Sequence, residues 1–398
     1  MSAAAGGGTG GVENESRRNG MTPEQRQIRD LAREFAENEL RPHAEAWDRE
    51  GHFPREVVGK LGELGFLGML LPERWDGLEL DTTSYLLALE QIAWGDSSVA
   101  VAMSVHNSLP TQMILAQGTE EQKERFLRPM ARGEWLGGFA LSEADAGSDA
   151  ASLAAQAVRA DGGWVLNGSK AWITNGGFGD VVIAMCRTDS PSDRKGAKGI
   201  GAFILRTDMD GYIVGKKEDK MGQRASETVG IAFRDLFVPD DQVLGDPSMG
   251  FVYALQGLDN GRMGIAALAT GIAQAALEHA LAYAAERRQF GRAIKDFQGM
   301  QFKLADMATR IEAARGLVYR AAEAKDAGEP VTRLASMAKL FATEAAMYVT
   351  TEAVQVFGGY GYMKEYPVEK LFRDAKVTEI YEGTSEVQRV VIARELYR

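Results

Sequence analysis

The sequence predicts a multidomain α+β protein in which a segment of short strands lies between two helical segments. Three observations predict this order. Apolar residues recur at helical spacing up to about residue 133, follow strand-like patterns to about residue 244, and return to long helical patterns from about residue 251. We therefore expect a disordered tail at residues 1–20 and domains at residues 21–133, 134–247 and 248–398.

The first domain is predicted to be helical and to open with a capped helix. Thr22 can cap this helix, Pro23 suits its first turn, and Gln25 completes a capping box. The residues before it are small and polar and lack the apolar stretch of a secretory signal, so we interpret them as a disordered tail. Further helices are predicted at Arg55 to Leu64, Thr83 to Trp94 and Glu120 to Met130.

The middle domain is predicted to consist of short strands. Asn167 and Gly168 lie between two apolar runs and give a strong signal for a two-residue hairpin. The single cysteine, Cys186, excludes an internal disulfide and a cysteine-rich metal site, and it is expected to be buried. Other strand-like runs lie at Val181 to Met185, Ala202 to Leu205 and Val229 to Phe233.

The last domain is predicted to be a bundle of long helices. Its alanine-, leucine- and methionine-rich faces recur at helical spacing and favour a tightly packed four-helix bundle. No run approaches the roughly 18 apolar residues of a membrane span, so we expect no integral membrane segment. The helices are expected at residues 251–287, 296–327, 331–357 and 385–397.

The charge of the chain limits its partners. It holds 45 basic and 56 acidic residues, for a net charge of −11, which argues against nucleic acid as the main partner. An anionic ligand would therefore need a local cluster of arginines. The four histidines are scattered along the chain and are interpreted as structural, so no metal site is expected.

The segment from Ile380 to Arg389 combines features of a ligand site. The carboxylate of Glu382 precedes Gly383, which would let a ligand approach the backbone. Ser385 and Gln388 have the spacing of a capping box, and a helix N-terminus offers N–H groups to an anion or a polar cofactor edge. From this segment alone, an ordinary loop carboxylate explains Glu382 equally well.

Four further segments resemble motifs of a known family. They are Phe139 to Asp149 (FALSEADAGSD), Asn167 to Gly176 (NGSKAWITNG), Arg287 to Gly291 (RRQFG) and Gln355 to Gly359 (QVFGG). Together with the terminal segment, and in this order, they resemble the acyl-CoA dehydrogenases, a family of flavoenzymes, and most closely its short-chain (butyryl-CoA) branch. The resemblance runs from about residue 22 to the end. It implies a helical domain, a β-barrel-like middle domain and a C-terminal four-helix bundle.

The resemblance also implies an activity. These enzymes use FAD to remove two hydrogens from the α and β carbons of an acyl-CoA, which yields a trans-2-enoyl-CoA. For this chain we expect a short- or medium-chain saturated substrate, electron-transferring flavoprotein as electron acceptor, and a homotetramer. The expected location is the cytoplasm in a bacterium, or the mitochondrial matrix in a eukaryote.

By the same resemblance, Glu382 is the base that removes the α proton, with its pKa raised by an apolar acyl chain and the flavin. Tyr381 and Gly383 are expected to line the acyl slot. Asp259 and Arg262 resemble a pair that contacts CoA, and a purely structural ion pair on a helix surface is the alternative for them.

Two subfamilies are disfavoured by single positions. Isovaleryl-CoA dehydrogenases carry the base directly before the arginine of the first bundle helix, where this chain has Gly261, which cannot act as a base. Glutaryl-CoA dehydrogenases hold a second carboxylate with an arginine, where this chain has Ala100. A buried, unpaired carboxylate is costly, so a dicarboxylyl substrate is not expected.

The resemblance implies a flavin site built from two regions, which in this family belong to two subunits. The region beside the ring and the base comprises Phe139, Leu141, Ser142, Gly147, Ser148, Trp172, Thr174, Thr384 and Glu386, with Ser148 also near the CoA arm. A buried core aromatic is the alternative for Trp172. The region expected to hold the pyrophosphate, ribityl and adenine parts comprises Arg287, Gln298, Gln355, Gly358 and Gly359.

Three rival functions share the predicted fold. An acyl-CoA oxidase would form peroxide rapidly, and the sequence does not show oxygen access. A nitroalkane oxidase resembles this chain less, because an aspartate usually replaces its base. A catalytically silent acyl-CoA-binding protein would be colourless and unable to take up FAD.

Overall fold

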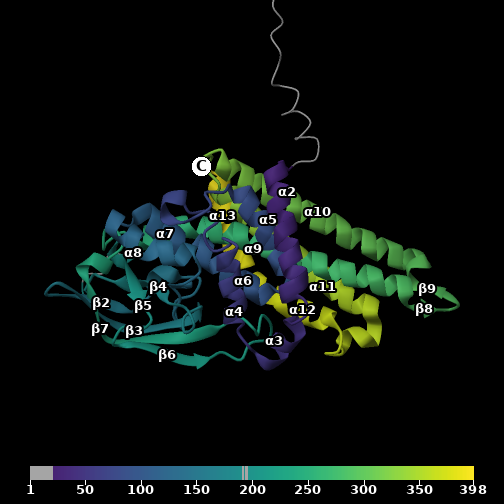
Figure 1. The fold of residues 1–398 in the computed structure, drawn as a ribbon, viewed down its shortest axis with the longest axis horizontal. Helices are drawn as coiled ribbons and strands as arrows, with labels where there is room; N and C mark the ends of the chain where they lie inside the picture. Colours follow the sequence, from purple (N-terminus) through teal and green to yellow (C-terminus); the bar gives the residue numbers. More distant parts are fainter. Residues whose placement is uncertain (1–20, 191, 193–195) are drawn as a thin grey trace, which may run out of the picture.

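The computed structural model describes residues 21–190, 192 and 196–398, so the predicted tail at residues 1–20 lies outside the described residues. A sheet lies at one end of the molecule and a helical bundle extends from it to the other end, with the N-terminal helices packed beside both (Figure 1). The N-terminal helices are α2 (Pro23–Phe35), α3 (Ala44–Glu50), α4 (Arg55–Glu63), α5 (Thr82–Gly95), α6 (Ser97–Ser108), α7 (Pro110–Gln117) and α8 (Glu120–Ala131).

The predicted start of α2 is confirmed. The Thr22 hydroxyl accepts a hydrogen bond from the backbone N–H of Gln25, whose side chain accepts one from the backbone N–H of Thr22. The two residues therefore satisfy each other's backbone donors, as the spacing predicts. A short π-helix at Ala36–Leu40 continues α2 and was not predicted from the sequence.

The middle segment forms a seven-stranded sheet in the order β1-β4-β2-β3-β7-β6, with β5 paired to β4. Residues on β4 and β5 are almost completely buried, which matches their continuous apolar runs, and Cys186 lies buried on β4 as predicted. The strands are β1 (Gly137–Ala140), β2 (Gln156–Ala160), β3 (Gly163–Thr174), β4 (Val181–Arg187), β5 (Ile200–Arg206), β6 (Tyr212–Lys217) and β7 (Thr228–Pro239).

The hairpin predicted at Asn167 and Gly168 is wrong. Strand β3 runs straight through both residues, and the pairing with β7 shifts register between Leu166 and Gly168. The Asn167 amide exchanges hydrogen bonds with Asp235 of the partner strand, at 3.0 and 2.9 Å. A Cβ on Gly168 would lie 2.7 Å from Ala155, so only glycine fits at this β-bulge. An Asn-Gly pair suits a bulge as well as a hairpin turn, which is why the prediction failed.

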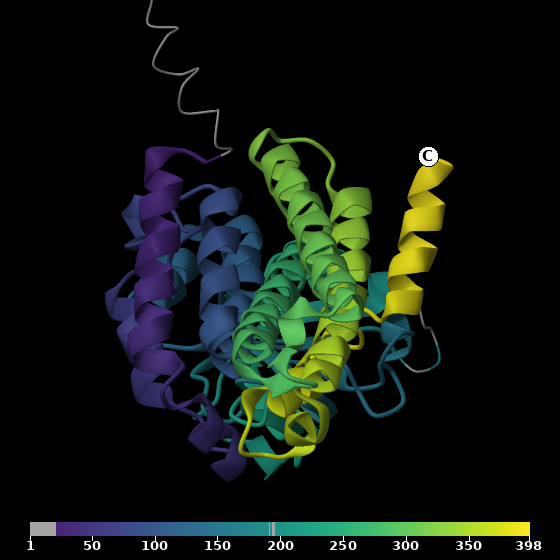
Figure 2. The ribbon, with the colours of Figure 1, turned by 90° about the vertical axis from the view of Figure 1, so that its right-hand side faces the viewer.

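The C-terminal helices are α9 (Gly250–Glu286), α10 (Gln298–Asp326), α11 (Thr332–Phe357), α12 (Pro367–Thr378) and α13 (Ser385–Leu396). Helix α12 was not predicted from the sequence; it packs against α9 and α11 and is therefore the fourth helix of the bundle. Helix α13 was predicted to belong to the bundle but lies on its outside, against α11 (Figure 2). A two-stranded hairpin of β8 (Arg288–Gln289) and β9 (Arg292–Ala293) closes the end of the bundle away from the sheet (Figure 1).

Helix α9 is the centre of the fold. Among the described residues it is the one helix that is long and apolar enough to cross a membrane by length and composition, contrary to our reading of the sequence. However, 72% of its most apolar stretch is buried inside the protein, against α5, α6, α10, α11 and α12. This burial is typical of the core helix of a bundle.

Candidate active site

Glu382 lies in the tight turn between α12 and α13. Its backbone has φ 56°, and that of Gly383 has φ 90°, so two consecutive residues are left-handed. Its carboxylate Oε2 is buried and has no hydrogen-bond partner among the described residues. Burial raises the pKa of Glu382 to about 7, while the charges of Arg262 and Lys339 act in the opposite direction. A carboxylate with this pKa can accept a proton near neutral pH, as a general base must.

The space for this carboxylate exists because α9 has a glycine opposite it. A Cβ built on Gly261 would lie 1.8 Å from Oε2 of Glu382 and 2.6 Å from its Cδ. The glycine that cannot act as a base therefore lies against the carboxylate that can. Positions 261 and 382 therefore lie next to each other in this fold, and only one side chain fits between them.

One turn further along α9, the space beside Gly264 ends at two hydroxyl groups. A Cβ on Gly264 would lie 2.6 Å from the Ser104 hydroxyl and 3.5 Å from the Tyr85 hydroxyl. Both side chains are buried, and among the described residues their hydroxyl groups interact only with each other. Burial raises the pKa of Tyr85 and the charge of Glu382 raises it further, against the hydrogen bond with Ser104, so Tyr85 lies close to the Glu382 carboxylate.

The pair Asp259 and Arg262 is not on the protein surface. Arg262 is buried, and its Nη1 donates to Asp259 Oδ1 at 2.6 Å, while the Thr332 hydroxyl donates to Asp259 Oδ2 at 2.6 Å. The Nε of Arg262 is buried without a partner among the described residues. The guanidinium thus keeps a hydrogen-bond donor and a positive charge beside Glu382.

Tyr381 is held by a chain of hydrogen bonds from another domain. Its hydroxyl accepts from the Gln223 side chain at 3.1 Å, and the Gln223 backbone N–H donates to Asp374 at 2.5 Å. Asp374 in turn accepts from Lys370 at 2.7 Å and from Ser97 at 2.9 Å. The loop beside the middle domain and the turn that carries Glu382 are therefore fixed to each other.

The predicted ring-side residues on β1, on the loop after it and on β3 lie near one another, while Thr384 and Glu386 lie at the start of α13. The backbone N–H of Ala171 donates to the carbonyl of Ser142 at 3.0 Å, which places the loop after β1 beside β3. Trp172 stands on a bulge of β3 with φ 61°, and its residue surface is 56% exposed, so it is not a core aromatic. Phe139, Ser142 and Thr174 are partly buried, Leu141 is buried, and Gly147 and Ser148 are exposed.

A buried ion pair fixes this loop against β3. Lys170 donates to Glu143 at 2.7 Å and to the carbonyl of Leu141 at 3.2 Å, and Glu143 also accepts from the backbone N–H groups of Ala154 and Ala155. Burial alone would raise the pKa of Glu143, but the charge and hydrogen bond of Lys170 hold it below its usual value. Sequence reasoning assigned no role to either residue.

The second predicted flavin region lies elsewhere. Arg287 ends α9, Gln298 begins α10, and Gln355, Gly358 and Gly359 lie at the end of α11, so all five meet at the hairpin end of the bundle, away from the sheet (Figure 1). All five are exposed. Arg287 stacks over Tyr360 at 5.6 Å and has no carboxylate partner in the part of the chain that the structure describes. One chain therefore carries two halves of a site that it does not bring together.

The start of α13 differs from the sequence prediction by one residue. Thr384 is the N-cap, and its hydroxyl accepts from the backbone N–H of Val387 at 3.3 Å. Ser385 is the first helical residue and its hydroxyl has no partner among the described residues, so the predicted capping box with Gln388 is wrong. Gln388 instead donates to the carbonyls of Glu382 and Gly383, and Glu386 is exposed beside Thr384.

These features fit the flavin that the resemblance implies. Trp172 exposes its indole ring and has a strained, left-handed backbone, and both features are costly in water. They suit a surface that the flat ring of a flavin covers. The backbone N–H of Glu382 makes no hydrogen bond within the described part of the chain, and it lies in the turn beside the base. At the hairpin end of the bundle, Arg287 has no carboxylate partner among the described residues, and such a guanidinium suits a pyrophosphate although the protein as a whole is acidic.

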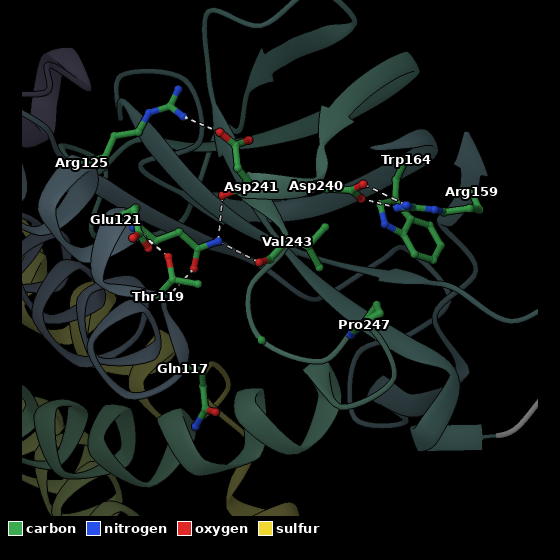
Figure 3. Close-up of a pocket in the computed structure, with 12 residues that line it drawn as sticks. Gln117, Thr119, Glu121, Arg125, Arg159, Trp164, Asp240, Asp241, Val243 and Pro247 are labelled. Atoms are coloured by element: carbon green, nitrogen blue, oxygen red, sulfur yellow. Dashed lines mark hydrogen bonds and ion pairs between the residues drawn. The ribbon is translucent and has the colours of Figure 1, made fainter. Parts of the chain in front are cut away.

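One open cleft lies apart from this site. It has a volume of about 780 Å³ and lies between the start of α8 and the edge formed by β2, β3 and the end of β7 (Figure 3). Its two arginines are already paired, Arg159 with Asp240 and Arg125 with Asp241. None of the predicted site residues is among the residues that line this cleft.

One further residue near Glu382, Lys339, was missed by sequence reasoning. Lys339 on α11 is completely buried and donates to the carbonyl of Gly383 at 2.8 Å, where Gln388 also donates. The available signal was a lysine within an otherwise alanine-rich stripe of α11. A charge on an apolar helix face needs a partner, and here the partner is the turn that carries the base.

Comparison with known proteins agrees with this geometry. Three family models match the chain: the acyl-CoA dehydrogenase N-terminal domain at residues 22–134, the middle domain at 138–236 and the C-terminal domain at 248–397. The short-chain specific acyl-CoA dehydrogenase of Clostridium acetobutylicum is 47% identical over 378 residues, which covers 95% of this chain and 99% of the relative.

Two solved structures are similar over almost the whole chain. The butyryl-CoA dehydrogenase of Megasphaera elsdenii superimposes with a TM-score of 0.93 at 46% identity, covering 95% of this chain and 99% of that one. A chain from the structure described as the electron transferring flavoprotein of Acidaminococcus fermentans gives the same values. Family models over all three domains and these identities show that the chain belongs to the acyl-CoA dehydrogenase family of FAD-dependent oxidoreductases.

Proposed function

We propose that the protein dehydrogenates a short-chain saturated acyl-CoA to the trans-2-enoyl-CoA, with Glu382 as the base. The observation that carries this proposal is the buried, unpartnered carboxylate oxygen of Glu382 against the bare backbone of Gly261. This oxygen makes no hydrogen bond among the described residues, so it can accept the α proton of a bound substrate. The proposed domain limits remain 21–133, 134–247 and 248–398.

The residues of the chain have separate tasks in this reaction. Glu382 takes the α proton, and the α carbon keeps the electron pair of the broken bond as the double bond forms. The backbone N–H of Glu382 would hold the thioester oxygen, where negative charge develops. Bound FAD supplies the acceptor for the β hydrogen, which leaves as hydride. Tyr381 and Gly383 shape the slot, and Asp259, Arg262 and Ser148 are proposed to hold the CoA arm.

The floor of the slot supports a short acyl chain. Gly261 and Gly264 are three residues apart, which is about 4.5 Å along the helix axis. At Gly264 the backbone of α9 already packs closely against Ser104 and Tyr85. A longer acyl chain would have to displace these buried side chains, so we propose that they limit its length. Gly261 also lacks the base that isovaleryl-CoA dehydrogenases carry at this position, and Ala100 lacks the arginine that holds the second carboxylate in glutaryl-CoA dehydrogenases.

The binding of FAD is proposed to use two copies of the chain. Phe139, Leu141, Ser142, Gly147, Trp172, Thr174, Thr384 and Glu386 would hold the ring side. The hairpin end of a second copy would supply Arg287, Gln298, Gln355, Gly358 and Gly359. The same end exposes large apolar side chains, with Phe290 93% and Tyr362 84% exposed, as expected for a surface that a second copy covers. We propose a homotetramer with electron-transferring flavoprotein as its redox partner. The proposed location is the cytoplasm of a bacterium or the mitochondrial matrix of a eukaryote.

The substrate proposal is tested by anaerobic titration of the purified protein with butyryl-, octanoyl- and isovaleryl-CoA. We expect a yellow protein whose flavin absorbance is bleached most effectively by butyryl-CoA, because Ser104 and Tyr85 are proposed to limit the length of the acyl chain. Stronger bleaching by octanoyl-CoA would overturn the short-chain assignment. A yellow protein that none of the three bleaches would overturn the activity. Rapid peroxide formation in air would identify an oxidase.

The assembly proposal is tested by the mass of the FAD-loaded protein in solution, measured by light scattering during gel filtration. We expect four chains of 43.2 kDa each, as the family resemblance implies. The flavin contacts and the apolar hairpin end each require at least a second copy. A monomer that keeps its FAD would contradict the shared site.

A further inference from the structure

The turn that presents Glu382 is a strained piece of backbone. Glu382 has a β-carbon and nevertheless adopts φ 56°, directly before Gly383 at φ 90°. Residues other than glycine, asparagine and aspartate rarely adopt this conformation, and it persists only where surrounding groups enforce it. The neighbours of the turn therefore decide where the carboxylate of the proposed base lies.

Two buried side chains converge on one atom of this turn. The carbonyl of Gly383 accepts hydrogen bonds from Lys339 Nζ at 2.8 Å and from Gln388 Nε2 at 2.9 Å, and Gln388 also reaches the carbonyl of Glu382 at 3.3 Å. Lys339 comes from α11 and Gln388 from α13, and both are completely buried. The turn is thus tied to two helices through its carbonyls, and the carboxylate of Glu382 takes no part in these bonds.

Lys339 is an unusual residue for its place. A buried ammonium group is costly unless it is paired, yet the Gly383 carbonyl is its only hydrogen-bond partner, and no carboxylate lies within ion-pair distance, among the described residues. Burial lowers the pKa of Lys339 to about 8, while the nearby carboxylates of Glu382 and Glu379 act against this lowering. One turn earlier on α11, Ser336 is equally buried and its hydroxyl has no partner in the described chain, so burial alone does not create the contact.

We propose that Lys339 is a positioning residue, which fixes the Glu382–Gly383 turn through the carbonyl of Gly383 and so aims the carboxylate into the acyl slot. This inference rests on the proposed role of Glu382 as the base. Among the described residues Lys339 makes no hydrogen bond or ion pair with the carboxylate of Glu382. It acts through the backbone of the turn, and Gln388 supports it from the opposite helix.

A second effect of Lys339 follows from its charge. The charged and titratable groups that face Glu382 are Arg262 from α9, Lys339 from α11, Tyr85 from α5 and the neighbouring Tyr381. Arg262 and Lys339 are the two positive groups, and both favour the ionised carboxylate. Removal of Lys339 leaves Arg262 alone against the burial of Glu382, so the pKa of the base should rise.

The test compares K339M, K339Q, Q388M and the control S336A in the FAD-loaded protein with butyryl-CoA. Methionine fills the space of lysine but removes the donor and the charge, and glutamine offers a donor without a charge. We expect K339M to keep its FAD and its KM, to lose about 10- to 100-fold in kcat, and to need a higher pH for half-maximal kcat/KM. K339Q should recover part of kcat while the higher pH midpoint remains. Q388M should lower kcat without moving the midpoint.

S336A removes a buried polar group from the same face of α11 and should behave as the wild type. The proposal is overturned if K339M turns over like S336A, or if K339M loses only FAD binding. Crystal structures of K339M or K339Q give a readout without turnover, since φ of Glu382 should leave the left-handed region. A wild-type protein that no acyl-CoA reduces would refute the proposed function instead, and the backbone readout would still decide the role of Lys339.

Discussion

Replacement of Glu382 by glutamine is expected to lower kcat with butyryl-CoA by about 10⁴-fold, at the upper end of the range for a general base. Glutamine has nearly the same shape but cannot accept the α proton. The variant should still bind FAD and acyl-CoA, because neither the left-handed turn nor the bonds to its carbonyls involve the carboxylate. Stopped-flow reduction of the flavin measures the loss, and a spectral shift on addition of acyl-CoA reports binding.

Glu379→Gln is the matched control for this variant. Glu379 lies three residues earlier and pairs with Lys376 at 2.6 Å, outside the acyl slot, so its loss of charge should leave turnover close to the wild-type rate. Near-normal turnover of E382Q would place the base elsewhere. An equal loss in both variants would show that charge near the turn matters, and not the identity of the base.

The same variant gives a pH prediction for activity. Burial raises the pKa of Glu382 to about 7, so kcat/KM of the wild type should rise about tenfold per pH unit below 7 and level off above it. The residual activity of E382Q should not follow this curve. A wild-type profile that is flat between pH 5 and 8 would contradict a base with this pKa.

Ionisation of Glu382 should have the opposite effect on stability: activity rises with pH, but the contribution of Glu382 to the free energy of unfolding falls. The pKa of Glu382 is about 7 in the folded protein and about 4.3 in an unfolded chain, so between these values the folded state binds more protons. The contribution of Glu382 to the free energy of unfolding therefore falls as pH rises from about 4.3 to 7. E382Q lacks this loss and should be more stable than the wild type at pH 8, by up to about 4 kcal/mol, but equally stable at pH 4.

The sequence predicted those parts of the fold that local chemistry decides. The capping box at Thr22 is a contact between residues three apart, and it formed as expected. The prediction failed where one local pattern serves two structures. Asn167 and Gly168 suit a hairpin turn, but the Asn167 amide finds Asp235 on another strand and the pair forms a bulge. At α13, two adjacent hydroxyl residues could cap, and the first of them does.

The sequence likewise predicted some residues of the candidate site and missed others. A motif resemblance singled out Glu382 and the glycine at position 261, but one sequence could not show that these residues, 121 positions apart, touch. Lys339 was missed because a lone lysine in a helix resembles a surface residue until its partner is known. That partner, the carbonyl of Gly383, is a backbone atom, and no side-chain pattern in the sequence marks it.

Substitution of Gly261 by alanine is expected to lower kcat by about 100-fold while the protein stays folded and yellow. The added methyl group would lie 1.8 Å from Oε2 of Glu382, too close for any contact, so the carboxylate must swing away from the slot. A misplacement of about 1 Å at a reacting group can cost about 100-fold in rate. The measurement is again the rate of flavin reduction by butyryl-CoA, with FAD content and thermal unfolding recorded in parallel.

Gly316→Ala on α10 is the matched control, because a Cβ at that helical glycine meets nothing within 4 Å. It should leave kcat unchanged and stabilise the fold by about 0.5–1 kcal/mol. A sharper test uses a shorter carboxylate. E382D alone should slow the reaction, because the base withdraws from the substrate, but aspartate leaves room for the methyl group of G261A. The double variant G261A/E382D should therefore lose much less than the product of the two single losses. If the losses simply multiply, the methyl group does not act on the carboxylate, and the close approach of α9 to the base does not control the chemistry.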